Sequence, residues 1–240
     1  MVKLSLTSLP EKRVNILRSI SQKRYELLLF AASIYATALA AQEILHERSI
    51  PDLARAGSES SEILLKHWKQ GNVVVLVRHV ERCDHSDAPC LNDANGITER
   101  AVEVAQRLGS DFKSMGLEET DIYSSSLTRA VQTSAYMFNA DVPRLDWLFD
   151  CKEGFRNQIA QQKRAHRNLI LVTHSECMNR LEESLELPSY RTPKYGASLF
   201  LKLADPQMEP EMVGILNASD WSDLLSELDG RRFPTHSFRQ

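Results

Sequence analysis

The sequence predicts an α/β protein with three layers, α/β/α, built on a mostly parallel sheet. Residues Val73–Val77 are all β-branched or aliphatic, which is typical of a strand buried on both faces. A second buried run, Leu169–Val172, repeats this pattern further along the chain. Between the two runs, apolar residues recur with helical spacing over residues 98–116, as in the crossover helix of a right-handed βαβ unit.

The N-terminal part differs from the rest of the chain in charge. The first 24 residues hold six lysines and arginines against Glu11 alone, about +5, although the formal net charge of the 240 residues is −3. Glu26 brings residues 1–40 to about +4, and the residues beyond Ala40 therefore sum to about −7. Counterion release on nucleic acid needs a cationic protein face, and we therefore expect no nucleic acid partner.

Residues Leu27–Ala41 form the only long apolar run. Its 15 residues are fewer than the about 20 of a membrane span. The basic flank before it and the small residues Ala36, Ala38 and Ala40 at its end are typical of an export signal. We interpret residues 1–41 as an export signal or a retained membrane anchor; an amphipathic helix of a globular domain is the alternative. The corresponding location is the periplasm, free or membrane-anchored, with the cytoplasm as the alternative.

Residues 42–70 are predicted to be a linker and one helix that ends near Gly71, with a partial apolar face for core packing. In the helix that follows the first strand, Thr98 is the expected N-cap and Gly116 the expected end. The core-facing stripe of that helix comprises Ala101, Ala105, Leu108 and Phe112.

Shorter sequence patterns predict the remaining helices, strands and turns. Ser124–Ser126 turn the chain into a helix whose first turn carries Arg129. The remaining elements are a short strand near Val142–Leu145, a helix near Phe155–Ala165, an edge strand at Ser198–Leu203, a packing helix around residues 220–225 and a disordered end at residues 231–240. We assign the main domain to residues 71–205 and a C-terminal extension to residues 206–240.

Four polar side chains follow the predicted strands at their carboxyl ends. Arg78 and His79 come after the first strand, Arg129 after the serine-rich turn, and His174 after Leu169–Val172. Open α/β sheets bind ligands at this edge. Arginine forks bind phosphate oxygens, and a helix N-terminus adds N–H donors. Either histidine alone would be interpreted as a core residue whose hydrogen bonds are made within the protein. The two arginines and two histidines together favour a phosphate site.

The loop Cys83–Gly96 is rich in Asp, Asn and Pro. Its side chains Asp84, His85, Asp87 and Asp93 form a conceivable metal cluster. In such loops, however, Asp, Asn and Ser side chains mostly stabilise turns, and we therefore expect neither a metal nor another cofactor.

Four cysteines bear on the redox compartment. Cys83 and Cys90 are separated by six residues in one loop, which makes a disulfide sterically easy. Cys151 and Cys177 flank the predicted site from different loops and could pair across it. An oxidising periplasm favours such bridges, whereas free thiols are the default in a cytosol. Three connectivities remain open.

Four segments, LVRHVER, ITERA, YSSSLTRAVQT and LVTHSE, match in order the signatures of a known family. Over Val73–Leu203 the sequence resembles the phosphoglycerate-mutase-like branch of the histidine phosphatase superfamily. The resemblance implies that His79 is the nucleophile and becomes phosphohistidine. It implies that Arg78, Arg129 and His174 bind the phosphoryl oxygens. Val80 stands where the family usually has glycine, which narrows the space beside the nucleophile.

In the family, an acidic residue from a loop transfers the proton. The matching stretch, Phe149–Gly154, offers Asp150 and Glu153 with equal weight. Glu81 is a third candidate, with the orientation of an arginine as its alternative role. Only 44 residues separate Arg129 and His174, fewer than in the family's mutases, and this implies a small variant without a lid. An open site suits a phosphate on a large molecule and weighs against mutase activity.

The cysteines add a closer resemblance, to the lipopolysaccharide core heptose(II)-phosphate phosphatase group. The shared features are the RHxERCD start, Cys90, Cys151 and Cys177. This resemblance implies a phosphatase that acts on a phosphorylated small molecule or glycolipid of the cell envelope, such as lipopolysaccharide core heptose. A phosphohistidine protein phosphatase and a non-catalytic phosphate-binding module are the alternatives.

Overall fold

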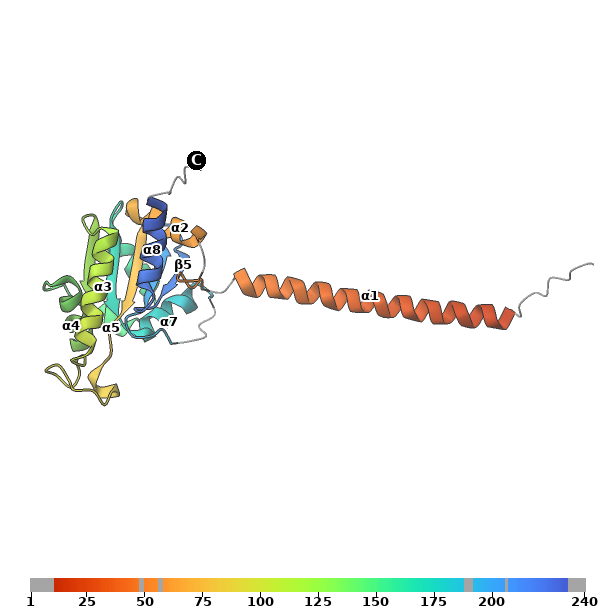
Figure 1. Ribbon diagram of the computed structural model, residues 1–240, viewed down its shortest axis with the longest axis horizontal. Coiled ribbons are helices and arrows are strands. Elements are labelled where there is room, and N and C mark those ends of the chain that lie inside the picture. The colour runs from red at the N-terminus through yellow and green to blue at the C-terminus, as the bar shows by residue number, and fades with distance from the viewer. Residues whose placement is uncertain (1–10, 48–49, 56–57, 188–191, 206, 233–240) are drawn as a thin grey trace, which may run out of the picture. The chain divides into compact units, whose positions relative to one another are not determined.

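The computed structural model describes residues 11–47, 50–55, 58–187, 192–205 and 207–232 (Figure 1). The chain divides into two compact units, residues 1–49 and residues 50–240.

The first unit contains one long helix, α1 (Glu11–Glu47). This helix continues past residue 41, and the predicted linker beginning at residue 42 is therefore helical as far as Glu47. The side chains of residues 23–40 are exposed, with Leu27 and Phe30 each 68% accessible. Among the described helices, none combines the length and the hydropathy that crossing a bilayer requires.

The second unit alternates helices and strands, as the sequence predicts. In chain order its elements are α2 (Ser58–Lys69), β1 (Val73–Arg78), the 3₁₀ turn η1 (Cys83–His85), α3 (Ala101–Met115), β2 (Thr120–Ser124), α4 (Thr128–Phe138), α5 (Trp147–Asp150), α6 (Phe155–Gln162), β3 (Asn168–Thr173), α7 (Ser175–Ser184), β4 (Ser198–Lys202), β5 (Glu211–Leu216) and α8 (Trp221–Arg232).

The five strands form one sheet in the order β2-β3-β1-β4-β5. Strands β2, β3 and β1 pair in parallel, and β4 and β5 extend the sheet with antiparallel pairs. The predicted edge position of Ser198–Leu203 is wrong, because β5 pairs with the far side of β4. Gly214 interrupts the apolar pattern of β5, which explains why the sequence does not mark that strand.

Helices cover both faces of the sheet and confirm the three-layer α/β/α prediction. Along β1, the alternate residues Val73, Val75 and Val77 join one core with side chains from α2, α3, α4 and α8. Val74 and Leu76 join the second core, with side chains from α5, α6 and α7. This alternation is the two-residue period of a strand buried on both faces.

The predicted stripe of α3 is buried, and its end at Gly116 is confirmed by the left-handed φ of +94° there. The prediction that Thr98 is the N-cap is wrong, because α3 begins at Ala101 and Arg100 is the N-cap. The Thr98 hydroxyl donates instead to Glu81, 2.9 Å away. The Thr98 hydroxyl, which the local pattern predicts as a helix cap, therefore makes a tertiary hydrogen bond instead.

Three further expectations have clear outcomes. The predicted strand near Val142–Leu145 is only an isolated bridge between Ser124 and Arg144. The predicted helices near residues 155–165 and 220–225 are present as α6 and α8, and Trp221 of α8 packs against Phe112, with ring centroids 4.6 Å apart. Of the end expected to be disordered, residues 231 and 232 lie in α8, and residues 233–240 lie outside the described residues.

Candidate active site

Two histidines meet where the central parallel strands end. Strands β1 and β3 are paired with Arg78 opposite Thr173, and each strand is followed directly by a histidine. The backbone N–H of His79 donates to the Thr173 carbonyl at 2.9 Å, which holds the two strand ends together. As a result, the rings of His79 and His174 lie 5.2 Å apart between centroids.

The hydrogen bonds of His79 define which of its ring nitrogens carries the proton. Nδ1 lies 2.7 Å from the Val80 carbonyl oxygen, which can only accept, and Nδ1 is therefore the protonated nitrogen. Nε2 accepts from Arg129 Nε at 3.2 Å and holds the free electron pair. Burial lowers the pKa of His79 to about 2, with the charges of His174 and Arg129 acting in the same direction. The ring is neutral at physiological pH.

His174 is held by the serine-rich turn after β2. Its Nε2 lies 2.8 Å from Ser125 Oγ, whereas its Nδ1 is buried and has no hydrogen-bond partner in the described part of the chain. Burial, followed by the charge of Arg129, lowers the pKa of His174 to about 4. The site therefore contains two neutral imidazoles, one of which has an unused ring nitrogen.

Two guanidinium groups lie beside the imidazoles. Arg129 is in the first turn of α4, and Arg78, at the end of β1, stacks on Tyr195 with its central carbon 4.0 Å from the ring centroid. Arg78 Nη1 donates to the Pro193 carbonyl, while its buried Nε lacks a partner within the described residues. Guanidinium donors without protein acceptors are suited to binding an oxyanion.

The space beside the nucleophile candidate is shaped by Val80. This side chain is 1% exposed, and its backbone N–H donates to Thr133 Oγ1 at 3.2 Å. Thr133 Oγ1 in turn donates to the Arg129 carbonyl at 2.6 Å. One hydroxyl therefore links the segment after β1 to the helix that carries Arg129.

The third candidate, Glu81, binds an arginine, Arg100. Its carboxylate accepts from Arg100 Nε at 2.6 Å, from Thr98 and from Ser86 Oγ at 3.1 Å. The Arg100 hydrogen bond is the main cause of its low pKa, about 2. The alternative that Glu81 orients an arginine is confirmed.

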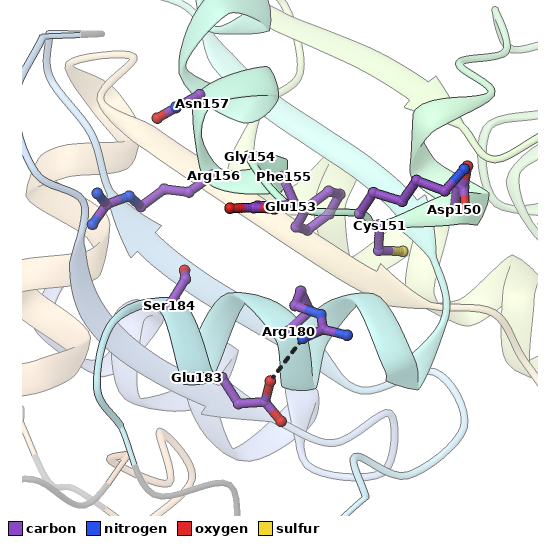
Figure 2. A pocket seen from close by; sticks show the side chains of 11 residues that line it. Asp150, Cys151, Glu153, Gly154, Phe155, Arg156, Asn157, Arg180, Glu183 and Ser184 are labelled. Carbon is purple, nitrogen blue, oxygen red and sulfur yellow. Dashed lines mark hydrogen bonds and ion pairs between the residues drawn. The ribbon is translucent and has the colours of Figure 1, made fainter.

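The structure places Asp150 and Glu153 in a neighbouring pocket. This pocket, about 730 Å³, lies between the start of α6 and the outer face of α7 (Figure 2). Its lining comprises Asp150, Cys151, Lys152, Glu153, Gly154, Phe155, Arg156, Asn157, Arg180, Glu183 and Ser184 and includes neither histidine of the site. Asp150 pairs with Lys152 at 2.5 Å. The two regions adjoin at Phe149, whose ring meets that of His174 edge-on at 6.5 Å.

In the loop 83–96, Asp84 pairs with Arg82. Within the described ranges, no three His, Cys, Asp or Glu side chains are grouped so that they could hold a metal ion.

No protein-family model matches the sequence. The chain is 31% identical over 196 residues to the lipopolysaccharide core heptose(II)-phosphate phosphatase of Salmonella arizonae, an alignment that covers 80% of this chain and 94% of the relative. The chain belongs to the lipopolysaccharide core heptose(II)-phosphate phosphatase family. The Salmonella typhimurium protein of the same name is 30% identical over 171 residues, which are 70% of this chain and 82% of the relative. The solved structure of the protein histidine phosphatase SixA complexed with tungstate is 14% identical, with 62% of this chain and 98% of that chain covered and a TM-score of 0.48.

In this member of the lipopolysaccharide core heptose(II)-phosphate phosphatase family, two disulfides flank the site. Cys83 is joined to Cys90 and Cys151 to Cys177, with the Cα atoms of each pair 5.2 Å apart. Of the three connectivities left open by the sequence, this one is present. The second bridge ties the loop after α5 to the first turn of α7, directly beside His174.

Sequence reasoning misses three side chains of this site. Tyr195 precedes β4, and only the antiparallel return of that strand beside β1 brings it under Arg78. Ser125 is visible as a turn residue, but its bond to His174 is not. Glu176 stands two residues after His174, at the start of α7, and this proximity was the available signal.

Proposed function

We propose that this chain is a phosphomonoesterase that removes a phosphate from a cell-envelope sugar, of the kind named for its relatives. The observation that carries the proposal is the neutral His79, with Nε2 unprotonated and facing Arg129. A neutral imidazole beside guanidinium groups is the arrangement that attack on a phosphate requires.

In the proposed reaction, His79 Nε2 attacks phosphorus in line with the leaving oxygen. Arg78 and Arg129 hold the equatorial oxygens, whose negative charge is spread in a loose transition state. His174 offers its unused Nδ1 as a further donor to the same group, in the tautomer in which Nε2 accepts from the Ser125 hydroxyl. Water then attacks the phosphohistidine and releases phosphate, which restores the neutral imidazole.

The proposal leaves one proton to be supplied. A sugar alkoxide is a poor leaving group and needs protonation as the P–O bond breaks. Asp150 and Glu153 stay predicted donors, and their position in the neighbouring pocket does not by itself favour either one.

Substitution of the nucleophile tests the proposal. We expect His79→Ala to lower hydrolysis of p-nitrophenyl phosphate by at least about 10³-fold, because no other group replaces the covalent step. Wild-type enzyme quenched during turnover should carry acid-labile, base-stable phosphate that the variant lacks. Unchanged thermal unfolding of the variant is the control, and full turnover by folded His79→Ala would contradict the mechanism.

We further propose that the protein works in the cell envelope. The two disulfides and the substrate in the relatives' name support this location. In this proposal, residues 1–41 direct export, or residues 27–41 associate with the membrane.

A further inference from the structure

Glu176 lies at the end of α7 that faces the two histidines. It is the second residue of this helix, and the residue before the helix is His174. Helical side chains tilt toward the helix N-terminus, which directs this carboxylate toward the histidine end. Cys177 and Met178 are fully buried and fix the rotation of the helix, and Glu176 is exposed.

Glu176 is not engaged by the partner that its own helix offers. Arg180 stands one turn further along, at the i+4 spacing that favours a Glu–Arg pair. Arg180 instead lies 3.4 Å from Glu183, at the neighbouring pocket (Figure 2). Glu176 accepts a hydrogen bond from Ser175 Oγ at 3.1 Å, the residue between it and His174. Its carboxylate therefore stays at the site end of the helix.

The charges of the site respond to this carboxylate. Burial raises the pKa of Glu176, but hydrogen bonds from its own N–H and from Ser175, with the charges of His174 and Arg78, bring the net pKa below its usual value. Conversely, burial lowers the pKa of Arg78 and Arg129, and the Glu176 carboxylate opposes that lowering in both. The same carboxylate raises the pKa of Arg82 on the loop after β1. Glu176 is thus within electrostatic reach of the cations that would hold the phosphate.

The neighbouring carboxylates have other partners, beginning with Asp84, which pairs with Arg82. Glu81 is fixed by Arg100, Thr98 and Ser86. Asp150 and Glu153 line the neighbouring pocket, whose lining includes neither histidine, and Asp150 pairs with Lys152. Glu176, by contrast, is the second residue of α7, whose N-cap is His174.

We propose that Glu176 transfers the proton in both half-reactions, an inference that rests on the phosphatase function proposed above. In the first, the N–P bond to His79 forms, the P–O bond to the sugar breaks, and the proton on Glu176 passes to the departing oxygen. In the second, Glu176 takes a proton from water while the O–P bond forms and the N–P bond breaks. The products are the alcohol and phosphate, and both residues return to their starting states.

Substrate binding prepares Glu176 for the first step. A phosphate dianion beside the carboxylate disfavours its charged form and raises its pKa. The cations that oppose this effect are Arg78 from β1, Arg82 from the following loop, Arg129 from α4 and His174 when protonated. Once the dianion occupies their donors, the proton on Glu176 becomes available to the leaving oxygen.

The test compares two esters that differ in their need for a proton. p-Nitrophenolate leaves without protonation, whereas the alkoxide of glycerol 2-phosphate does not. For Glu176→Gln we expect kcat/KM for glycerol 2-phosphate to fall about 10²- to 10³-fold and kcat/KM for p-nitrophenyl phosphate to fall less than about tenfold. The ratio of the two values cancels any change in phosphate affinity caused by the lost charge. Glu183→Gln, on the same outer face of α7, is the matched control and should leave the ratio unchanged.

Other outcomes overturn the assignment. An unchanged ratio in Glu176→Gln, or a selective loss on glycerol 2-phosphate in Asp150→Asn or Glu153→Gln, removes Glu176 from this role while the phosphatase proposal stands. Wild-type enzyme that hydrolyses neither ester overturns both proposals. Activity of Glu176→Gln on p-nitrophenyl phosphate also reports that the variant is folded.

Discussion

At the scale of single residues, the site depends on two histidines that are kept neutral by burial. His79 and His174 are 2% and 3% exposed, and their pKa values are lowered to about 2 and about 4. A neutral imidazole is what the proposed nucleophilic attack requires, but keeping these rings neutral has a consequence for stability. In the unfolded chain, these histidines become protonated near the ordinary histidine pKa of about 6.5. In the folded chain they stay neutral at that pH, and the unfolded state therefore binds more protons.

We therefore expect the free energy of unfolding to decrease as the pH falls from 6.5 to 5. Both folded pKa values lie below the unfolded value, and the stabilisation is fully present above about pH 6.5 and is lost progressively below it. The slope is at most about 1.4 kcal/mol per pH unit for each histidine, and His67, whose pKa burial also lowers, acts in the same direction. Urea unfolding at pH 7, 6 and 5 measures this dependence of the free energy of unfolding on pH.

The double variant His79→Asn/His174→Asn should show a shallower slope in the same range. Carboxylates with lowered pKa, such as Glu81 and Asp121, lose their contribution only below the unfolded value of about 4, outside this window. An equal slope in the variant and the wild type would show that the histidines are not the source.

The sequence predicts the site residues that directly follow strands, because parallel strand ends meet at one edge of a sheet. Arg78, the last residue of β1, and His79 and His174, which directly follow β1 and β3, obey this rule. Tyr195 and the Ser125–His174 hydrogen bond do not, since they depend on how β4 returns and on side-chain geometry across the sheet. The polar residues of the candidate site can therefore be predicted from the sequence, while the contacts that orient them cannot.

At the scale of elements, local patterns predict helices and strands well until a tertiary contact competes. The stripe of α3 and the buried run of β1 are reproduced, because each is long and strongly periodic. The N-cap of α3 and strand β5 are missed. The Thr98 hydroxyl donates to Glu81 and does not cap the helix. Gly214 breaks the apolar pattern of β5, and a Cβ at this position would lie 2.6 Å from the Pro51 carbonyl oxygen.

A second close approach joins α3 to α4, which run side by side (Figure 1). A Cβ at Gly109 of α3 would lie 1.7 Å from the Met137 carbonyl oxygen. We expect Gly109→Ala to lower the free energy of unfolding by about 1–3 kcal/mol, despite the higher helix propensity of alanine, because the helices must separate. Denaturant unfolding checks this.

Ser110→Ala is the matched control for that experiment. Ser110 is the next residue of α3, and its side chain is exposed. Alanine there should be neutral or raise the free energy of unfolding by a few tenths of a kcal/mol, since only the propensity changes. If Gly109→Ala is as stable as Ser110→Ala, the two helices are not in the close contact described.

At the scale of the whole molecule, the two units carry different chemistry. The four candidate phosphate-site residues and both disulfides belong to the unit of residues 50–240. The unit of residues 1–49 carries the cationic segment and the exposed apolar run of α1. This division is visible in the sequence as a change of charge sign, and it fits a segment that determines location beside a unit that performs the reaction.

The location proposal predicts a shortened protein with closed disulfides. A basic segment before an apolar run and small residues two apart at its end fit cleavage by signal peptidase after Ala38 or Ala40. N-terminal sequencing of protein purified from its native host should therefore begin at Leu39 or Ala41. Alkylation before and after reduction should reveal four thiols only after reduction, because both bridges form in the oxidising compartment. An N-terminus upstream of residue 27 on a membrane-bound protein would instead assign the apolar run to anchoring, and free thiols in the native protein would contradict export altogether.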